Sequence, residues 1–195
     1  MDTGAKIGLF FGSFNPIHIG HLIIANLMAE STDLRKVWFV VSPQNPFKPS
    51  KGLLHEFDRF DMVRAAIHDN YKLEACDVEF NMPKPSYTIH TLVYLQEKHP
   101  DKKFVLIMGE DNLTSFTRWK NHEQILENYG LYVYPRPGVQ LSDLGKHPNV
   151  RFVEAPLLDI SATFIRNAIR NKQSIRYLVP DPVEELIRAK GYYLH

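Results

Sequence analysis

Short apolar runs that do not alternate with polar residues constrain the fold of this chain most strongly. The clearest runs span residues 7–11, 37–41, 104–108 and 131–134, and a weaker one spans residues 150–153. A strand that is apolar on both faces must be covered on both faces, which is the environment of a parallel sheet between two helical layers. The runs therefore predict strands of a mainly parallel, buried sheet.

Segments with helical spacing of apolar residues lie between and after these runs. They cover residues 22–31, 56–69 and 88–99, and two shorter stripes follow at 165–169 and 183–187. Strands that alternate with helices imply right-handed βαβ crossovers. The predicted fold class is therefore α/β, a doubly wound, mainly parallel sheet with helices on both faces. A chain of 195 residues without a linker or repeat fits one domain spanning 1–195, with a helical segment from about residue 161 packed on it.

Composition excludes several classes of protein. The formal net charge of +1 offers no broad basic field, so no nucleic-acid partner is expected. The single cysteine, Cys76, excludes an internal disulfide, and it is expected to be a small buried hydrophobe rather than a reactive thiol. No apolar stretch approaches the ~20 residues that span a bilayer, and the first residues do not read as a signal peptide. We expect a cytoplasmic protein that does not enter a membrane.

The turn after the first strand carries the first group of chemically informative residues. The chain reads Gly12-Ser13-Phe14-Asn15-Pro16-Ile17-His18-Ile19-Gly20-His21, and a helix is expected to open near Gly20. A helix N-terminus presents unpaired N–H groups and attracts phosphate. Two imidazoles three residues apart there can face one ligand. Two other interpretations stay open: a zinc site, which needs three or four ligands, and a simple helix cap.

A second group of residues stands near the other end of the chain, in Asp159-Ile160-Ser161-Ala162-Thr163-Phe164-Ile165-Arg166. Ser161 or Thr163 is the expected N-cap of the helix that follows. Hydroxyls, unpaired N–H groups and Arg166 one turn in favour a second phosphate site. Ligands of open α/β sheets bind beyond the C-terminal ends of the strands. The loops at 42–52, 81–86 and 135–148 are therefore expected to rim one site.

The two groups together resemble the nucleotidyltransferase superfamily, whose pattern joins (His/Thr)-x-Gly-His to a late Ser-x-Thr-x-x-Arg. Within it, the chain is most similar to bacterial nicotinate-nucleotide adenylyltransferases. Five further segments carry this resemblance, and with the two motifs they cover nearly the whole chain: Asn45-Pro46-Phe47-Lys48, Ser86-Tyr87-Thr88, Gly109-Glu110-Asp111-Asn112-Leu113 followed by Phe116 and Trp119, Arg136-Pro137-Gly138, and Ser174-Ile175-Arg176-Tyr177-Leu178-Val179-Pro180.

The resemblance implies a Rossmann-like fold and adenylyl transfer from ATP to nicotinate mononucleotide, with in-line attack and no covalent intermediate. It implies catalytic roles for His18, His21 and Arg166. The implied ATP-binding residues are Gly12, Ser13, Phe14, His18, His21, Gly109, Asp111, Ser161, Thr163 and Arg166. The implied acceptor-binding residues are Lys48, Thr88, Trp119 and Arg136. Mg²⁺ would be held mainly by the ATP phosphates and water rather than by protein side chains.

The sequence departs from the family pattern at two positions, and it leaves other functions open. Phe11-Gly12 stands where Gly-Gly is common, and Asn15 stands where Asp is frequent. The acceptor is alternatively nicotinamide mononucleotide or phosphopantetheine, and a nucleotide-binding sensor without turnover is a further hypothesis. A class I tRNA synthetase does not fit the short chain. Tyr192 and Tyr193 fit either a homo-oligomer interface or packing on the chain's own last helix.

Overall fold

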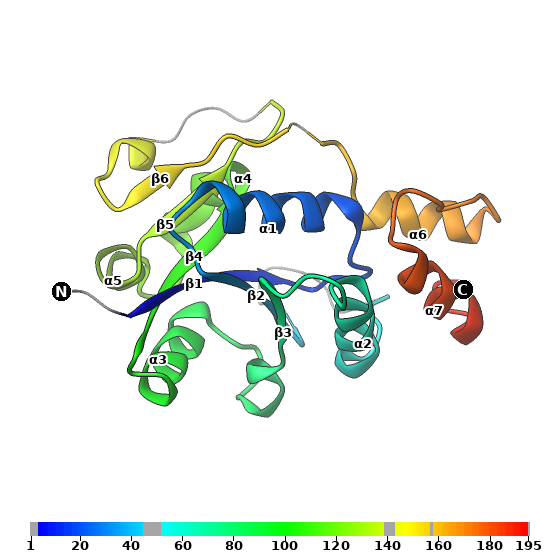
Figure 1. Cartoon of the computed structure of the whole chain (residues 1–195), viewed down its shortest axis with the longest axis horizontal. Helices are drawn as coiled ribbons and strands as arrows, with labels where there is room; N and C mark the ends of the chain where they lie inside the picture. The colour runs from blue at the N-terminus through cyan, green and yellow to red at the C-terminus, as the bar shows by residue number, and fades with distance from the viewer. Residues whose placement is uncertain (1–3, 45–51, 139–142, 157, 195) are drawn as a thin grey trace.

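The computed structural model describes residues 4–44, 52–138, 143–156 and 158–194. Six strands form one sheet in the order β3-β2-β1-β4-β5-β6, and every neighbouring pair is parallel. The strands are β1 (Ala5–Gly12), β2 (Lys36–Val41), β3 (Leu73–Cys76), β4 (Lys102–Gly109), β5 (Leu131–Tyr134) and β6 (Val150–Phe152). The predicted doubly wound parallel sheet is confirmed (Figure 1).

Helices cover both faces of this sheet, as predicted from its apolar runs. They are α1 (Ile19–Ser31), α2 (Glu56–Ala66), α3 (Thr88–Lys98), α4 (Glu110–Ser115), α5 (His122–Asn128), α6 (Ala162–Arg170) and α7 (Asp181–Lys190), and three 3₁₀ turns are η1 (Val78–Asn81), η2 (Phe116–Arg118) and η3 (Asp143–Lys146). One core packs α1, α2, α6 and α7 around Phe39 and Ile107, and the other packs α3 and α5 around Leu9 and Leu106. Figure 1 shows α1 and α3 on opposite sides of the sheet.

Four short elements, β3, α4, α5 and η3, are not among the elements expected from sequence. Strand β3 has four residues with Glu74 exposed, so its run is neither long nor wholly apolar. Helices α4 and α5 have six and seven residues, too few to display a repeated apolar stripe. The loop expected at 135–148 contains the one-turn η3. Cys76 ends β3 half-buried, and burial raises the pKa of its thiol to about 11, as an unreactive thiol requires.

The strand order places a topological switch point between β1 and β4. The chain runs outward from β1 through β2 to β3, and then crosses to the other side of β1 to build β4, β5 and β6. The loops that leave β1 and β4 diverge there, and such a point opens a crevice at the carboxyl ends of the strands. Gly12 ends β1 and Gly109 ends β4, so the fold directs both predicted glycine turns to this crevice.

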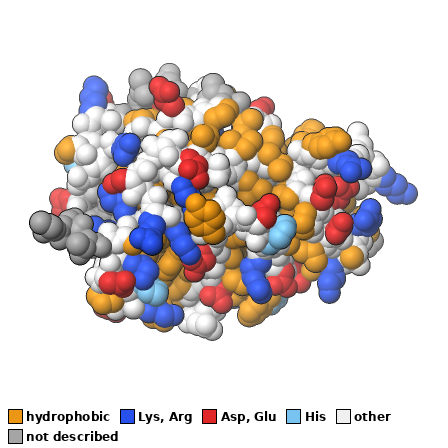
Figure 2. All heavy atoms as spheres, in the orientation of Figure 1, with side chains coloured by type: hydrophobic (Ala, Val, Ile, Leu, Met, Phe, Trp, Pro, Cys, Tyr) orange, Lys and Arg blue, Asp and Glu red, His pale blue; other side chains and the backbone are white. Residues whose placement is uncertain are grey.

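The surface carries interspersed charges rather than one dominant field. Figure 2 shows Lys and Arg side chains next to Asp and Glu side chains across the visible face, in keeping with a net charge of +1. In the part of the chain that the structure describes, no helix has both the length and the apolar character needed to cross a bilayer.

Candidate functional site

A cavity of about 640 Å³ opens at the switch point, a size suited to a nucleotide-sized ligand. Its walls come from the carboxyl ends of β1, β2 and β4 and from the starts of α3, α4 and α6. Every predicted site residue that the structure describes lines this one cavity: Gly12, Ser13, Phe14, His18, His21, Thr88, Gly109, Asp111, Trp119, Arg136, Ser161, Thr163 and Arg166. Lys48 lies outside the described residues.

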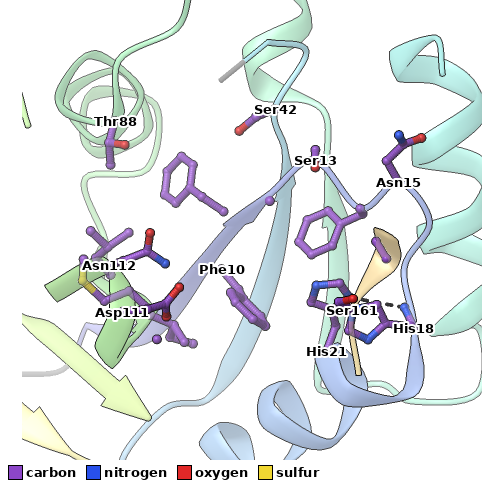
Figure 3. Close-up of a pocket in the computed structure, with 18 of the residues that line it drawn as sticks. Phe10, Ser13, Asn15, His18, His21, Ser42, Thr88, Asp111, Asn112 and Ser161 are labelled. Carbon is purple, nitrogen blue, oxygen red and sulfur yellow. Dashed lines mark hydrogen bonds between the residues drawn. The ribbon is translucent and has the colours of Figure 1, made fainter. Parts of the chain in front are cut away.

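The turn after β1 presents its two histidines as a stacked pair. The rings of His18 and His21 lie 3.6 Å apart, centroid to centroid, and 24° from parallel (Figure 3). The backbone N–H of His18 donates to Nδ1 of His21 at 3.2 Å. An Nδ1 that accepts carries no hydrogen, so a neutral His21 ring has its hydrogen on Nε2. Phe14 packs edge-on against His21 at 5.1 Å and limits its rotation.

His18 is buried and uncharged in this environment. Only 5% of its surface is exposed, and its Nδ1 has no hydrogen-bond partner among the described residues. Burial, and next the positive charge of Arg136, lowers the pKa of His18 from 6.5 to about 4. Gly20 leaves room for this ring, because a Cβ there would lie 3.1 Å from Nδ1 of His18. A buried polar atom without a partner is a stability cost that functional sites carry more often than cores.

The low pKa of His18 predicts a specific loss of stability in mild acid. Between pH 6.5 and pH 4 the unfolded chain binds a proton at His18 that the native state excludes, so stability falls as pH falls. From pH 7 to pH 5 this residue should remove about 2 kcal/mol from the free energy of unfolding. Urea titrations at both pH values measure it. Between the two pH values, the free energy of unfolding of His18→Asn should fall by about 2 kcal/mol less than that of the wild type. Equal decreases in the two proteins would contradict a buried, neutral His18.

The second motif lies beside the first, at the start of α6, and lines the same cavity (Figure 3). Ser161 is the N-cap: its hydroxyl accepts from the N–H of Phe164 at 3.2 Å. Arg166 donates through Nη1 to the backbone oxygen of Asn15 at 2.7 Å and through Nη2 to the hydroxyl of Thr163 at 3.2 Å. The guanidinium therefore ties α6 to the turn that carries the histidines, although the two segments lie 151 residues apart.

The end of β4 forms the opposite wall. Gly109 is the N-cap of α4, and a Cβ there would lie 3.2 Å from the Tyr134 ring, so only a glycine fits without a shift. Asp111, in the first turn of α4, faces Nε of Arg136 at 3.6 Å. The Arg136 guanidinium also lies over the Tyr134 ring at 5.4 Å. These contacts place the positive charge of Arg136 between the wall at α4 and the histidine pair.

The remaining part of the cavity lies at the start of α3. Thr88 is the first residue of α3, and no side chain caps that N-terminus. Trp119 is half-buried beside Phe116, with ring centroids 5.6 Å apart. Lys120, which the sequence reasoning missed, places its ammonium 4.8 Å from the centre of the Tyr87 ring and lines the same cavity. In the sequence, its position directly after Trp119 was the feature that could have indicated that it lines the cavity. Figure 3 shows Thr88 on the far side of Phe10 from the imidazoles.

A buried carboxylate, also missed from sequence, organises this end of the site. Glu79 is 2% exposed and accepts from the hydroxyls of Ser86 and Thr91, each at 2.7 Å. Burial raises the pKa of Glu79, while the hydroxyl donors, Ser42 among them, oppose the shift by stabilising the carboxylate. The carboxylate thus fixes the 86–88 segment against the end of β2. The signal in the sequence was an acid between two apolar residues, Val78 and Phe80.

Replacing Glu79 with glutamine should disturb this end of the cavity selectively. The amide has one acceptor instead of two, so a buried hydroxyl loses its partner at a cost of about 1–3 kcal/mol of unfolding free energy. The start of α3 then shifts. KM should rise about tenfold for a substrate that binds at the start of α3, and less for a substrate that binds at the histidine pair. Steady-state kinetics with each substrate varied measure both effects. Glu74→Gln, at an exposed ion pair with Lys36, is the control and should change neither value.

Comparison with known proteins places the chain in a family. The cytidylyltransferase-like family model matches residues 9–168. A Cytophaga hutchinsonii protein named "Probable nicotinate-nucleotide adenylyltransferase" is 66% identical over 188 residues, 96% of this chain and 98% of that protein. A Flavobacterium psychrophilum protein of the same name is 50% identical over 190 residues, again 96% of this chain and 98% of its own length.

Solved structures share the fold. The Plasmodium falciparum nicotinic acid mononucleotide adenylyltransferase complexed with NaAD superposes with a TM-score of 0.82 over 97% of both chains, at 20% identity. The resemblance stated from the sequence motifs is therefore confirmed at the level of fold and family. Because the family model covers most of the chain and relatives match it over nearly their whole length, the chain belongs to the nicotinate-nucleotide adenylyltransferase family, within the cytidylyltransferase-like enzymes.

Proposed function

We propose that this chain transfers the adenylyl group of ATP to nicotinate mononucleotide, yielding nicotinate adenine dinucleotide and pyrophosphate. The observation that carries the proposal is the pairing of two helix starts suited to phosphate in one cavity, with the stacked histidines at α1 beside Ser161 and Arg166 at α6. Family membership supports the same reaction.

The reaction is a direct displacement at the α-phosphorus of ATP. A phosphate oxygen of the acceptor forms the new P–O bond, the bond from the α-phosphorus to the α,β-bridging oxygen breaks, and pyrophosphate leaves with that electron pair. No protein nucleophile takes part. Catalysis comes from alignment of the two substrates and from donors aimed at the charge that develops on the phosphates.

The histidine pair and Arg166 are assigned to the ATP phosphates. In a neutral His21 the Nε2–H donates to a phosphate oxygen, because Nδ1 is engaged by the His18 backbone. The guanidinium of Arg166 is positioned by two bonds and adds a charge that stays fixed through the reaction. Ser161 and Thr163 border the same oxygens, and Asp111 is assigned to the ATP ribose. Gly12, Ser13, Phe14 and Gly109 shape the walls for the nucleotide.

Acceptor recognition is assigned to the part of the cavity at the start of α3. Thr88 and the uncapped N–H groups of α3 suit the nicotinate carboxylate, because a helix N-terminus favours an anion. Trp119 supplies an aromatic face for the pyridine ring, and Lys120 adds a positive charge nearby. Arg136 lies close enough to His18 to influence its pKa, so it suits an acceptor phosphate that must approach the α-phosphorus. Lys48 is proposed as a further positive charge on the acceptor side.

Mg²⁺ fits this site as an ion that arrives with ATP. Among the residues described here, no three His, Cys, Asp or Glu side chains converge to hold a cation. Mg²⁺ prefers phosphate oxygens and keeps several waters, so the triphosphate itself would supply its ligands, with the hydroxyls of Ser161 and Thr163 nearby. When bound, the ion neutralises charge on the leaving pyrophosphate.

Pyrophosphate release with ATP and Mg²⁺ tests the proposal, with nicotinate mononucleotide, nicotinamide mononucleotide and phosphopantetheine compared in parallel. A strong preference for nicotinate mononucleotide is expected, because an anion suits the start of α3 better than a neutral amide does. Release with another acceptor only would keep adenylyl transfer and overturn the acceptor assignment. ATP binding without release from any acceptor would favour a nucleotide sensor instead.

A further inference from the structure

Asn15 bonds the histidine turn to three other segments of the chain, at residues 52–54, at Arg166 on α6 and at Tyr193 after α7. The side chain is 5% exposed, and Figure 3 shows its amide directed away from the two imidazoles. Its Oδ1 accepts from the N–H of Leu54 at 3.3 Å, and its Nδ2 donates to the oxygen of Gly52 at 3.0 Å. Its backbone oxygen is the one that holds Arg166. A shift of Asn15 therefore moves both the histidine turn and the arginine.

Tyr193 supplies the remaining contact of Asn15. It follows helix α7, is 6% exposed, and donates its hydroxyl to Oδ1 of Asn15 at 2.9 Å across 178 positions of the chain. Its backbone φ of 67° lies in the left-handed region, which a bulky residue keeps only where its surroundings hold it. Burial raises the pKa of the phenol, so the group is neutral and can donate at any working pH.

Arg59 holds the same turn at its start, two residues before Asn15. Arg59 is fully buried and donates to the backbone oxygen of Ser13 at 2.6 Å and to that of Ser42 at 2.8 Å. Arg59 thus fixes the turn where it leaves β1. The Tyr193 hydroxyl acts two residues later, at the position where Arg166 is attached.

We propose that Tyr193 is a positioning residue for adenylyl transfer, acting through Asn15 on the histidine turn and on Arg166. The inference rests on the proposed function, since it concerns how the phosphate-binding groups are held for that reaction. Tyr193 itself touches no substrate, because its hydroxyl lies behind the turn and it is not among the residues that line the cavity. Of the two uses considered for this tyrosine, packing within its own chain is the one observed.

Tyr192 offers a matched control one residue away. Its hydroxyl donates to Oδ1 of Asp58 on α2 at 2.7 Å, so Tyr192→Phe removes a tyrosine hydroxyl bond from the same segment. That bond does not reach the turn. Both variants keep the aromatic ring and its packing, so a loss due to a looser segment after α7 would affect the two alike.

The experiment compares wild type, Tyr193→Phe and Tyr192→Phe by kcat, KM for each substrate, ATP affinity by calorimetry, and melting temperature. Tyr193→Phe should lower kcat/KM for ATP about tenfold and weaken ATP binding, with KM for the acceptor changed less than about twofold. Tyr192→Phe should match wild type within about twofold in each value. Equal kinetic effects in both variants, or none in Tyr193→Phe, would overturn the inference.

A double substitution tests the route. In an Asn15→Ala background, Tyr193→Phe should add less than about twofold, because the partner of the hydroxyl is gone. A further tenfold loss in that background would show that Tyr193 acts by another path and would overturn the inference. If wild type released no pyrophosphate with any acceptor, the proposed function would fail. The ATP affinities of the variants would then still decide whether Tyr193 positions the phosphate site.

Discussion

Replacing His21 with alanine is expected to lower kcat by about 10²- to 10³-fold while the protein stays folded. The imidazole is oriented before substrate arrives: its Nδ1 accepts from the His18 backbone, and its ring stacks on His18 and packs against Phe14. A donor fixed in this way costs no reorganisation when charge develops on the phosphates, which is why its loss falls on kcat more than on substrate affinity.

The measurement is pyrophosphate release at saturating ATP, with circular dichroism and melting temperature as checks on folding. His68→Ala is the control, because His68 is exposed and its Nδ1 lies 3.0 Å from the backbone oxygen of Ala65, one turn earlier in the chain. It should retain wild-type kcat. Near-normal turnover of His21→Ala would contradict the assigned role, whereas an inactive variant with a lost melting transition would call for His21→Gln as a replacement that keeps a donor.

The sequence predicted the sheet and the position of the cavity because both depend on local pattern. Wholly apolar strands identify a buried parallel sheet, and the carboxyl ends of such strands are where ligands bind. The turn after 7–11 and the Ser161 to Arg166 segment are each recognisable within ten residues of sequence. The structure brings them to one cavity, while the roles assigned to the individual residues there remain predictions.

The residues that the sequence did not reveal are those whose meaning depends on distant partners. Arg59 reads as a polar position of a helix, yet its guanidinium is buried against carbonyl oxygens of two loops. Asn15 read only as a departure from a frequent Asp. The structure supplies a reason for the amide: Nδ2 donates to the oxygen of Gly52, and a carboxylate has no hydrogen to give there. Contacts of this kind are set by the fold and leave no periodic trace.

Arg166→Ala is expected to have an effect as large as that of His21→Ala, with a different kinetic signature. Arg166 carries a permanent charge, so it attracts the triphosphate in the ground state as well as in the transition state. Its removal should therefore raise KM for ATP and lower kcat/KM for ATP by about 10²- to 10³-fold. Arg166→Lys should recover little, because one ammonium cannot reach the Asn15 oxygen and the Thr163 hydroxyl as the planar fork does.

Arg170 provides the control for this prediction, since it lies one turn further along α6, is exposed and donates to the side-chain oxygen of Asn167. Arg170→Ala removes the same charge from the same helix and should change kcat/KM for ATP less than about threefold, because an exposed charge is screened.

Measuring kcat/KM for ATP at two salt concentrations distinguishes long-range electrostatic attraction, which salt screens, from direct contact with the guanidinium. The prediction is wrong if Arg166→Ala and Arg170→Ala lose activity equally and added salt abolishes the difference from wild type in both. ATP would then respond to the summed positive charge of α6 rather than to the Arg166 guanidinium in contact with it. A loss confined to Arg166 that persists in salt would tie the reaction to the guanidinium that bonds α6 to the histidine turn, across 151 positions of the chain.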